Sequence, residues 1–232
     1  MGKTFVAMIP ARLGSKRIPK KNIRYLGDKP LIQYPIDLAK NEGKFSKVLV
    51  NTESEELGKI VQGMGAKFHQ RPEELANDMA TNREFTYEFM EKHVCDYVIM
   101  VNPTSPMLRQ KTLHDFMEYV EANEFDTVLS VISAKEETFF KDEPLNFSFD
   151  KKINSQLLEA TESICWALTA WKRETFMRLQ EEGINPVFGG NIGRFSIPKD
   201  ESCDLDTLED WNIAEGILKS RTNKFEERYI KL

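Results

Sequence analysis

The chain has 232 residues, of which 41% are hydrophobic and 30% are charged, and its formal net charge is −5. This composition is typical of a soluble globular protein with an apolar core. The sequence contains no run of about 18 apolar residues, which excludes a membrane-spanning helix. An acidic chain lacks the basic face that nonspecific nucleic-acid binding needs, so we expect neither a membrane nor a nucleic acid as a partner.

The cysteines and histidines of the chain show no spacing that is typical of a metal site or a disulfide framework. They are Cys95, Cys165, Cys203, His69, His93 and His114. Unpaired cysteines are typical of a reducing compartment, so we expect a cytoplasmic protein. For each histidine we expect a structural or surface role.

Apolar runs of strand length alternate along the chain with stretches of helical periodicity. The apolar runs cover 4–11, 47–52, 96–103 and 127–134. The helical stretches cover 30–43, 54–65, 81–93 and 110–122, and Ser54 and Thr81 are candidate N-terminal caps. Continuous apolar strands that alternate with helices predict an α/β fold, a Rossmann-like and mainly parallel sheet covered by helices.

The alternation of strands and helices stops over 135–172, where aromatic, charged and turn residues precede a strand-like run that ends at 172. We expect one domain over 1–232, with 135–172 as an insertion on its sheet. Four aromatic residues of this segment would either form a dimer surface or close a small core of their own. They are Phe139, Phe140, Phe147 and Phe149. A final helix is expected to begin near Leu205.

The first apolar run leads into a basic loop, IPARLGSKRIPKKN, at 9–22. Ligands of parallel sheets bind beyond the carboxyl ends of the strands, so this loop lies where a site is expected. It has neither glycine-rich phosphate motif, so phosphate would be held mainly by side chains such as Arg12, Lys16 and Lys21. A solvated basic loop without a ligand is the alternative.

Two further segments are expected at the same edge of the sheet. The segment NPTSP, at 102–106, follows the run at 96–103 and carries Asn102, Thr104 and Ser105. The segment CDLDTLEDW, at 203–211, carries Asp204 and Asp206 two positions apart. Two carboxylates beside a triphosphate would suit Mg²⁺, whereas in isolation they would be acidic residues at a helix N-terminus.

Together, IPARLGSKRIPKKN, RPEELAND at 71–78, NPTSP and DLDT resemble the acylneuraminate cytidylyltransferases, which make CMP-sialic acid and related CMP-sugars. The resemblance covers about 1–134 and 190–218 in the family's order, and the KKN ending is closer to the sialic and legionaminic branch than to the Kdo branch. It implies nucleotide contacts, catalytic groups and a metal site. The nucleotide contacts are Arg12, Ser15, Lys16, Lys21, Asn22, Arg71, Ala80 and Asn82. The catalytic residues are Lys21, Arg12 and Asp206, and the Mg²⁺ ligands are Asp204 and Asp206.

The chain departs from the family on the acceptor side. Asn102 stands where the family has glutamine, and ATESICWALTAW (160–171) replaces a PNGAIY-like strand. No arginine occurs between Arg109 and Arg173. We assign acceptor contacts to Asn102, Thr104, Ser105 and Glu162.

Three functions follow from these patterns. The first is Mg²⁺-dependent transfer of CMP from CTP to an acidic sugar of the sialic, legionaminic or pseudaminic type, with release of pyrophosphate by a homodimer. The second keeps CTP but uses an acceptor that bears a phosphate or phosphonate. The third is a nucleotide-binding protein of the same fold without catalysis.

Overall fold

The computed structural model describes residues 2–222 and has one seven-stranded sheet at its centre. The strand order is β11-β7-β10-β6-β1-β4-β5, and β10 runs antiparallel to both of its neighbours, while the other pairings are parallel. The mainly parallel sheet expected from the sequence is therefore confirmed. The strands are β1 (Phe5–Pro10), β4 (Phe45–Thr52), β5 (Lys67–Gln70), β6 (Tyr97–Val101), β7 (Thr127–Ala134), β10 (Thr161–Lys172) and β11 (Ile192–Ser196).

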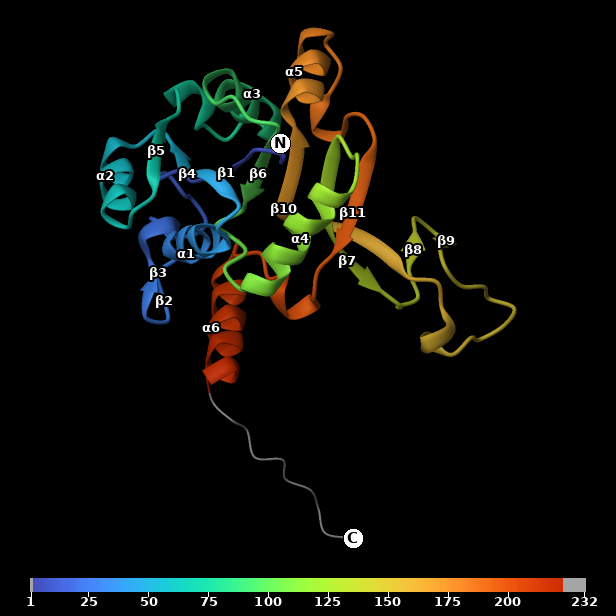
Figure 1. Cartoon of the computed structure of the whole chain (residues 1–232). Helices are drawn as coiled ribbons and strands as arrows, with labels where there is room; N and C mark the ends of the chain where they lie inside the picture. Colours follow the sequence, from blue (N-terminus) through green and yellow to red (C-terminus); the bar gives the residue numbers. More distant parts are fainter. Residues whose placement is uncertain (1, 223–232) are drawn as a thin grey trace.

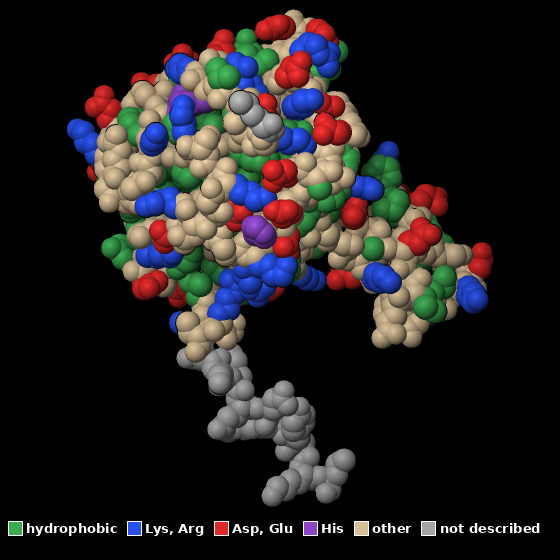
Figure 2. All heavy atoms as spheres, viewed as in Figure 1, with side chains coloured by type: hydrophobic (Ala, Val, Ile, Leu, Met, Phe, Trp, Pro, Cys, Tyr) green, Lys and Arg blue, Asp and Glu red, His purple; other side chains and the backbone are tan. Residues whose placement is uncertain are grey.

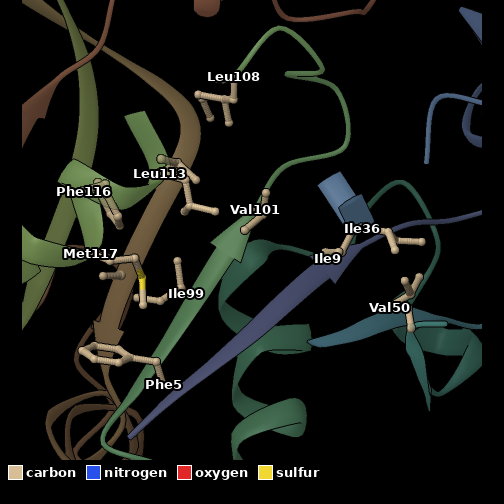
Figure 3. Close-up of a cluster of buried hydrophobic side chains, with 14 of the residues drawn as sticks. Phe5, Ile9, Ile36, Val50, Ile99, Val101, Leu108, Leu113, Phe116 and Met117 are labelled. Carbon is tan, nitrogen blue, oxygen red and sulfur yellow. The ribbon is translucent and has the colours of Figure 1, made fainter. Parts of the chain in front are cut away.

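Helices cover both faces of this sheet (Figure 1). They are α1 (Gln33–Glu42), α2 (Glu55–Gly63), α3 (Asn82–Lys92), α4 (Gln110–Ala122), α5 (Arg173–Glu181) and α6 (Leu208–Thr222). Ile36 of α1 and Phe116 of α4 pack in one apolar cluster with β1 and β6, as Figure 3 shows. Phe89 of α3 and Phe176 of α5 pack in a second cluster on the opposite face. Burial on both faces explains why β1 and β6 are continuous apolar runs.

The short elements lie in the connections between the long ones. They are β2 (Tyr25–Leu26), β3 (Lys29–Pro30), β8 (Phe139–Phe140), β9 (Glu143–Pro144) and the 3₁₀ turns η1 (Lys21–Ile23), η2 (Glu73–Leu75), η3 (Ser155–Leu157), η4 (Pro186–Phe188) and η5 (Lys199–Glu201). The structure also contains β5, α5 and β11, which the sequence patterns did not predict. No helix of the described part combines the length and apolar character needed to cross a membrane.

The segment 135–172 differs from the expected insertion because it has two unlike parts. Residues 161–172 form β10, which lies inside the sheet between β6 and β7. Only 135–160, with the β8–β9 hairpin and η3, projects beyond the sheet, at the ends of β7 and β10 (Figure 1). We call 135–160 the arm. We expected a single domain over 1–232. The structure describes 2–222 of it, and residues 1 and 223–232 lie outside the described part.

Candidate active site

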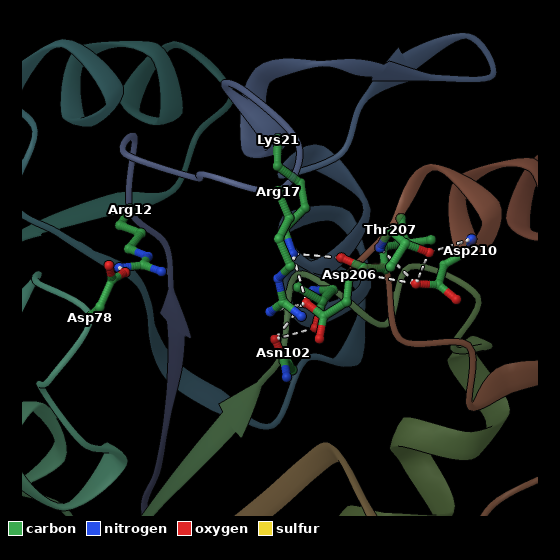
Figure 4. Close-up of polar contacts among 10 residues, drawn as sticks. Arg12, Arg17, Lys21, Asp78, Asn102, Asp206, Thr207 and Asp210 are labelled. Carbon is green, nitrogen blue, oxygen red and sulfur yellow. Dashed lines mark hydrogen bonds and ion pairs between the residues drawn. The ribbon is translucent and has the colours of Figure 1, made fainter.

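Three loops meet at the carboxyl edge of the parallel strands. They follow β1, follow β6 and precede α6, and Figure 4 shows their polar side chains facing one another. Each loop contributes an apolar residue to a third buried cluster, in which Ile18, Met107 and Leu205 pack together with Trp211 of α6. The backbone amide of Leu205 also donates to the carbonyl of Thr104, at 2.8 Å. Because these apolar side chains are buried together, the three loops are held in one place.

The basic loop has a defined conformation because of Lys20 and Asn22. Lys20 has a left-handed backbone, with φ of 53°, and the turn η1 follows it directly. Asn22 is buried, and its Nδ2 donates to the carbonyl of Arg12, at 2.8 Å. The amide of Leu13 donates to the carboxylate of Glu53, at 3.0 Å. These contacts fix the loop from both ends.

A cavity of about 240 Å³ lies between this loop, the end of β6 and the start of α3. We call it the base-side cavity. Arg12, Arg71, Ala80, Asn82 and Asn102 line it, so the structure brings together most of the residues expected around the base. Burial lowers the pKa of Arg71 to about 10.

The guanidinium of Arg71 is largely engaged with the protein itself. Its Nε donates to Oδ1 of Asn51, at 2.9 Å, and its plane lies over the ring of Phe85, at 4.7 Å. Nη2 contacts the carbonyl oxygens of Ala11 and Asn51. Arg71 therefore joins β1, β4 and α3 behind the cavity wall.

A second cavity, of about 160 Å³, lies on the other side of Arg12. We call it the phosphate-side cavity, and Ser15, Lys16, Lys21 and Asn22 line it. Two cations of the loop, Arg12 and Lys16, are paired with one carboxylate. Asp78 accepts from Arg12, at 2.7 Å, and is ion-paired with Lys16. The pKa of Asp78 is held below its usual value by the hydrogen bonds from Lys16 and Arg12.

Asp206 lies against the basic loop, and Asp204 lies beside it in the chain. Asp206 is ion-paired with Arg17, at 2.9 Å, and with Lys21, at 3.4 Å, while Nζ of Lys21 also donates to the carbonyl of Leu205, at 2.5 Å. Partial burial of the carboxyl group, followed by the nearby charge of Asp206, raises the pKa of Asp204. Asp204 and Asp206 are two positions apart in the chain, and neither of them lines the base-side or the phosphate-side cavity.

The donor set at this position fits Mg²⁺ only together with a bound nucleotide. Within 2–222 no group of three or more His, Cys, Asp or Glu side chains is arranged to hold a metal ion. Mg²⁺ is commonly bound by one or two carboxylates, with phosphate oxygens and waters as the other ligands. Asp204 and Asp206 supply that number of carboxylates, and a triphosphate in the phosphate-side cavity would supply the phosphate oxygens.

Asp210 is a supporting residue that the sequence reasoning missed. Its Oδ2 accepts from the backbone amides of Asp206, at 3.0 Å, and Thr207, at 2.7 Å (Figure 4). It therefore orients the segment that carries Asp206 while it caps the start of α6. The signal was present in the sequence, because Thr207 and Asp210 have the spacing of a capping box.

The residues expected on the acceptor side are not all in one place. Asn102 and Thr104 line the phosphate-side cavity, and Oδ1 of Asn102 accepts from the hydroxyl of Thr104, at 2.9 Å. Ser105 is buried behind them. Glu162 lies outside both cavities, at the start of β10, and is ion-paired with Arg194, at 3.1 Å. The predicted contact of Glu162 with the acceptor stays a prediction.

Both the sequence and the fold of the chain match known proteins. The sequence model described as cytidylyltransferase matches residues 6–208. The chain belongs to the cytidylyltransferase family. The family resemblance predicted from the motifs is thereby confirmed, since the matched range includes the basic loop, NPTSP and both aspartates.

Individual relatives of the chain carry names that specify a sugar. N-acylneuraminate cytidylyltransferase A of Danio rerio is 29% identical over 212 residues, which are 90% of this chain and 49% of the relative. The chain thus spans about half the length of that relative. Pseudaminic acid cytidylyltransferase of Campylobacter jejuni is 27% identical, and the match covers 92% of this chain and 96% of the relative.

The fold also matches solved structures. A CMP:2-keto-3-deoxy-manno-octonic acid synthetase complexed with CTP superimposes with a TM-score of 0.67 at 19% identity, over 94% of this chain and 99% of that chain. At this identity the match establishes the shared fold.

Proposed function

We propose that the protein transfers CMP from CTP to an acidic sugar of the sialic, legionaminic or pseudaminic type and releases pyrophosphate. The observation that carries this proposal is the pair of adjoining cavities at the carboxyl edge of the sheet. Arg12 and Asn102 line both of them. One cavity suits a nucleoside and the other, lined by cations, suits its phosphates. The names of the relatives support cytidine and an acidic sugar as the two substrates.

In this proposal the chain's own residues mainly position the reactants and neutralise charge. Arg12 and Lys16 exchange their contact with Asp78 for contacts with phosphate oxygens. Lys21, whose side chain is only 12% exposed, stabilises the charge on the departing pyrophosphate. The acceptor's hydroxyl attacks the α-phosphorus from the side of Asn102 and Thr104, in line with the leaving group.

Asp204 and Asp206 are proposed to hold Mg²⁺ beside the triphosphate. When bound, the ion would neutralise phosphate charge and favour ionisation of the attacking hydroxyl.

The arm is proposed to join two copies of the chain. Phe139, Phe140, Leu145 and Phe149 are 54–72% exposed on it, and Figure 2 shows apolar side chains on its surface. Phe139 also packs against Phe147, at 5.0 Å between ring centroids, so the aromatic residues both form a small cluster and leave apolar surface. Light scattering would test the proposed homodimer, and a monomer at micromolar concentration would contradict it.

We further infer a cytoplasmic location and the absence of a nucleic-acid partner. Cys95, Cys165 and Cys203 are free thiols, which supports a reducing compartment. The net charge of −5 argues against a nucleic-acid partner. Cell fractionation tests the first inference, and a duplex-binding titration at low salt tests the second.

Pyrophosphate release from CTP, measured with and without Mg²⁺, tests the reaction. The acceptors should include acidic sugars and phosphate- or phosphonate-bearing alcohols. We expect Mg²⁺-dependent release with an acidic sugar, and about a 100-fold loss of turnover in Asp206→Ala, because a charge-stabilising group is removed. Asp115→Ala, on the outer surface of α4, is the control and should keep wild-type turnover.

Each other outcome identifies a different function. Release only with a phosphate- or phosphonate-bearing acceptor would indicate a CDP-type product. Binding of CTP without release for any acceptor would indicate a nucleotide-binding protein. Full turnover of Asp206→Ala with Mg²⁺ present would show that the metal assignment is wrong.

A further inference from the structure

A buried carboxylate, that of Glu201, lies outside the two cavities of the candidate site. Glu201 ends the turn η5, three positions before Asp204, and its side chain is only 1% exposed. A charge at this depth is costly unless it is paired and hydrogen-bonded, so its partners are informative. Its hydrogen bonds come from Arg109, which lies at the end of the loop that carries Thr104.

Glu201 holds Arg109 by its backbone and by its side chain at once. Oε2 of Glu201 accepts from the backbone amide of Arg109, at 2.8 Å, and Oε1 accepts from the guanidinium, at 2.6 Å. Arg109 is the residue before the first turn of α4, so the carboxylate also lies at the positive end of that helix. Because one bond goes to the main chain, the carboxylate fixes where the loop ends.

Two further residues connect this pair to the end of α6. Asp200 is ion-paired with Arg109 and also with Arg221, the latter at 3.2 Å. Arg221 donates to the carbonyl of Met107 as well, at 2.8 Å. We call the four charged residues the clamp, namely Arg109, Asp200, Glu201 and Arg221. The clamp joins the loop after β6, the turn η5 and the last turn of α6.

The loop after β6 and the segment that follows η5 meet a second time beyond the clamp. The amide of Leu205 donates to the carbonyl of Thr104, at 2.8 Å. Only residues 202–204 lie between this bond and Glu201, so Asp204 has little freedom to move relative to Thr104. Asp206, which follows Leu205, faces the basic loop (Figure 4). The clamp therefore restricts the position of both aspartates.

The chemistry of the clamp favours a role in geometry over a role in stability. A buried ion pair is an inefficient way to stabilise a fold, since the cost of removing two charges from water offsets most of their attraction. In some proteins such pairs instead impose a single arrangement. Mg²⁺ demands a near-ideal octahedral arrangement of its ligands. A metal site with two aspartates from one short segment therefore needs that segment in one position.

We propose that Glu201 and Arg109 are positioning residues, which hold the two aspartates where Mg²⁺ and a triphosphate meet. Neither residue touches a substrate, and both act through the segment that carries the aspartates. This inference rests on the proposed function and adds to it the residues that give its metal site a fixed geometry.

Isothermal titration calorimetry of CTP, with Mg²⁺ and with EDTA, tests this role without relying on turnover. Glu201→Ala removes both bonds to Arg109. We expect it to weaken CTP binding about tenfold in Mg²⁺, the lower end of the effect of residues that orient metal ligands. In EDTA the same variant should weaken CTP binding less than about twofold, because the aspartates then hold no metal.

A second variant and a matched control separate positioning from stability. Glu201→Gln keeps an oxygen for the amide of Arg109 but loses the ion pair, so it should weaken binding in Mg²⁺ about threefold. It decides the test if Glu201→Ala does not fold, as a thermal unfolding curve would show. Glu88→Ala also removes a buried, ion-paired carboxylate, in α3. It should leave the ratio of the two CTP affinities unchanged.

The outcomes separate this inference from the proposed function. If wild-type CTP binding is stronger in Mg²⁺, and the Glu201 variants weaken binding equally in Mg²⁺ and EDTA or in neither, this inference is wrong and the proposed function stands. If the wild-type protein binds CTP no better in Mg²⁺ than in EDTA, the proposed metal site and this inference are both overturned.

Discussion

Single residues of the proposed nucleotide site already pair their charges within the protein. Asp78 binds Arg12 and Lys16, the two cations that we assign to phosphate oxygens. A triphosphate must displace this carboxylate before it can use them. In the proposed function, Asp78 therefore competes with the triphosphate.

Asp78→Asn should accordingly bind CTP more tightly, by about two- to fivefold, the scale of an exposed ion pair. Isothermal titration calorimetry at low salt measures this change. CMP is the control ligand, because it lacks the outer phosphates, and its affinity should change less. Asp37→Asn, which breaks an ion pair with Lys29 elsewhere, should change neither affinity. Weaker CTP binding by Asp78→Asn would contradict the proposed competition.

Among the elements, α6 is expected to couple stability to the proposed metal site. Asp210, in the first turn of α6, accepts through one oxygen from the amides of Asp206 and of the cap residue Thr207. Asp210→Ala should lower the free energy of unfolding by about 1 kcal/mol, because it removes these hydrogen bonds from the capping box. It should also raise the Mg²⁺ concentration needed for half-maximal activity, because Asp206 loses its orientation.

Ser54→Ala is the matched control, since Ser54 caps α2 through the amide of Leu57, at 3.2 Å. Urea unfolding and Mg²⁺ titrations of both variants separate the two effects. An unchanged Mg²⁺ requirement in Asp210→Ala would show that Asp210 acts on stability alone.

The elements also show what sequence patterns can and cannot predict. Buried strands such as β1 and β6 were predictable because their apolar runs are continuous, and the capping box of α3 at Thr81 and Glu84 is present as its spacing indicated. The strand β5 was missed because its four residues mix polar and apolar types. The position of β10 between β6 and β7 depends on pairing with strands that are distant in the sequence, and a local sequence pattern does not predict such pairing.

The same limit applies to the candidate site. The basic loop, Asn102 and Asp206 could be predicted to converge, since parallel strands end at one edge of a sheet. The pairing of Asp78 with the loop could not, because it depends on how the segment after η2 folds back. The left-handed backbone of Trp166 in β10, with φ of 57°, could not be predicted either, because tryptophan has no local preference for this region.

At the scale of the whole molecule, a buried polar cluster between β5 and α3 predicts how stability depends on pH. His69 is bonded to Glu88, at 2.8 Å, and to His93, at 3.0 Å. Burial lowers the pKa of His69, and it lowers the pKa of His93 to about 4. Below the ordinary histidine pKa near 6.5, the unfolded chain therefore binds protons that the folded chain excludes.

Stability should thus be complete above about pH 6.5 and should fall as the pH drops toward 4. We expect a loss of about 1 kcal/mol at pH 5, less than full burial would give because His93 is only half-buried. Urea unfolding at pH 7.5, 6 and 5 measures it. His93→Phe should reduce this pH dependence, while His114→Gln, on the exposed surface of α4, should not. Equal slopes in all three proteins would exclude the cluster as the cause.

The position of β10 between β6 and β7 affects how the sheet can form while the chain is being synthesised. When synthesis has reached the end of the arm, β1, β4, β5 and β6 can already pair with one another, whereas both neighbours of β7 are still to be made. The apolar run TVLSVISA then has no partner strand, and its edges are open to other nascent chains. The next dozen residues form β10 and cover one edge of β7, but the other edge stays open until β11 has been made, at Ser196.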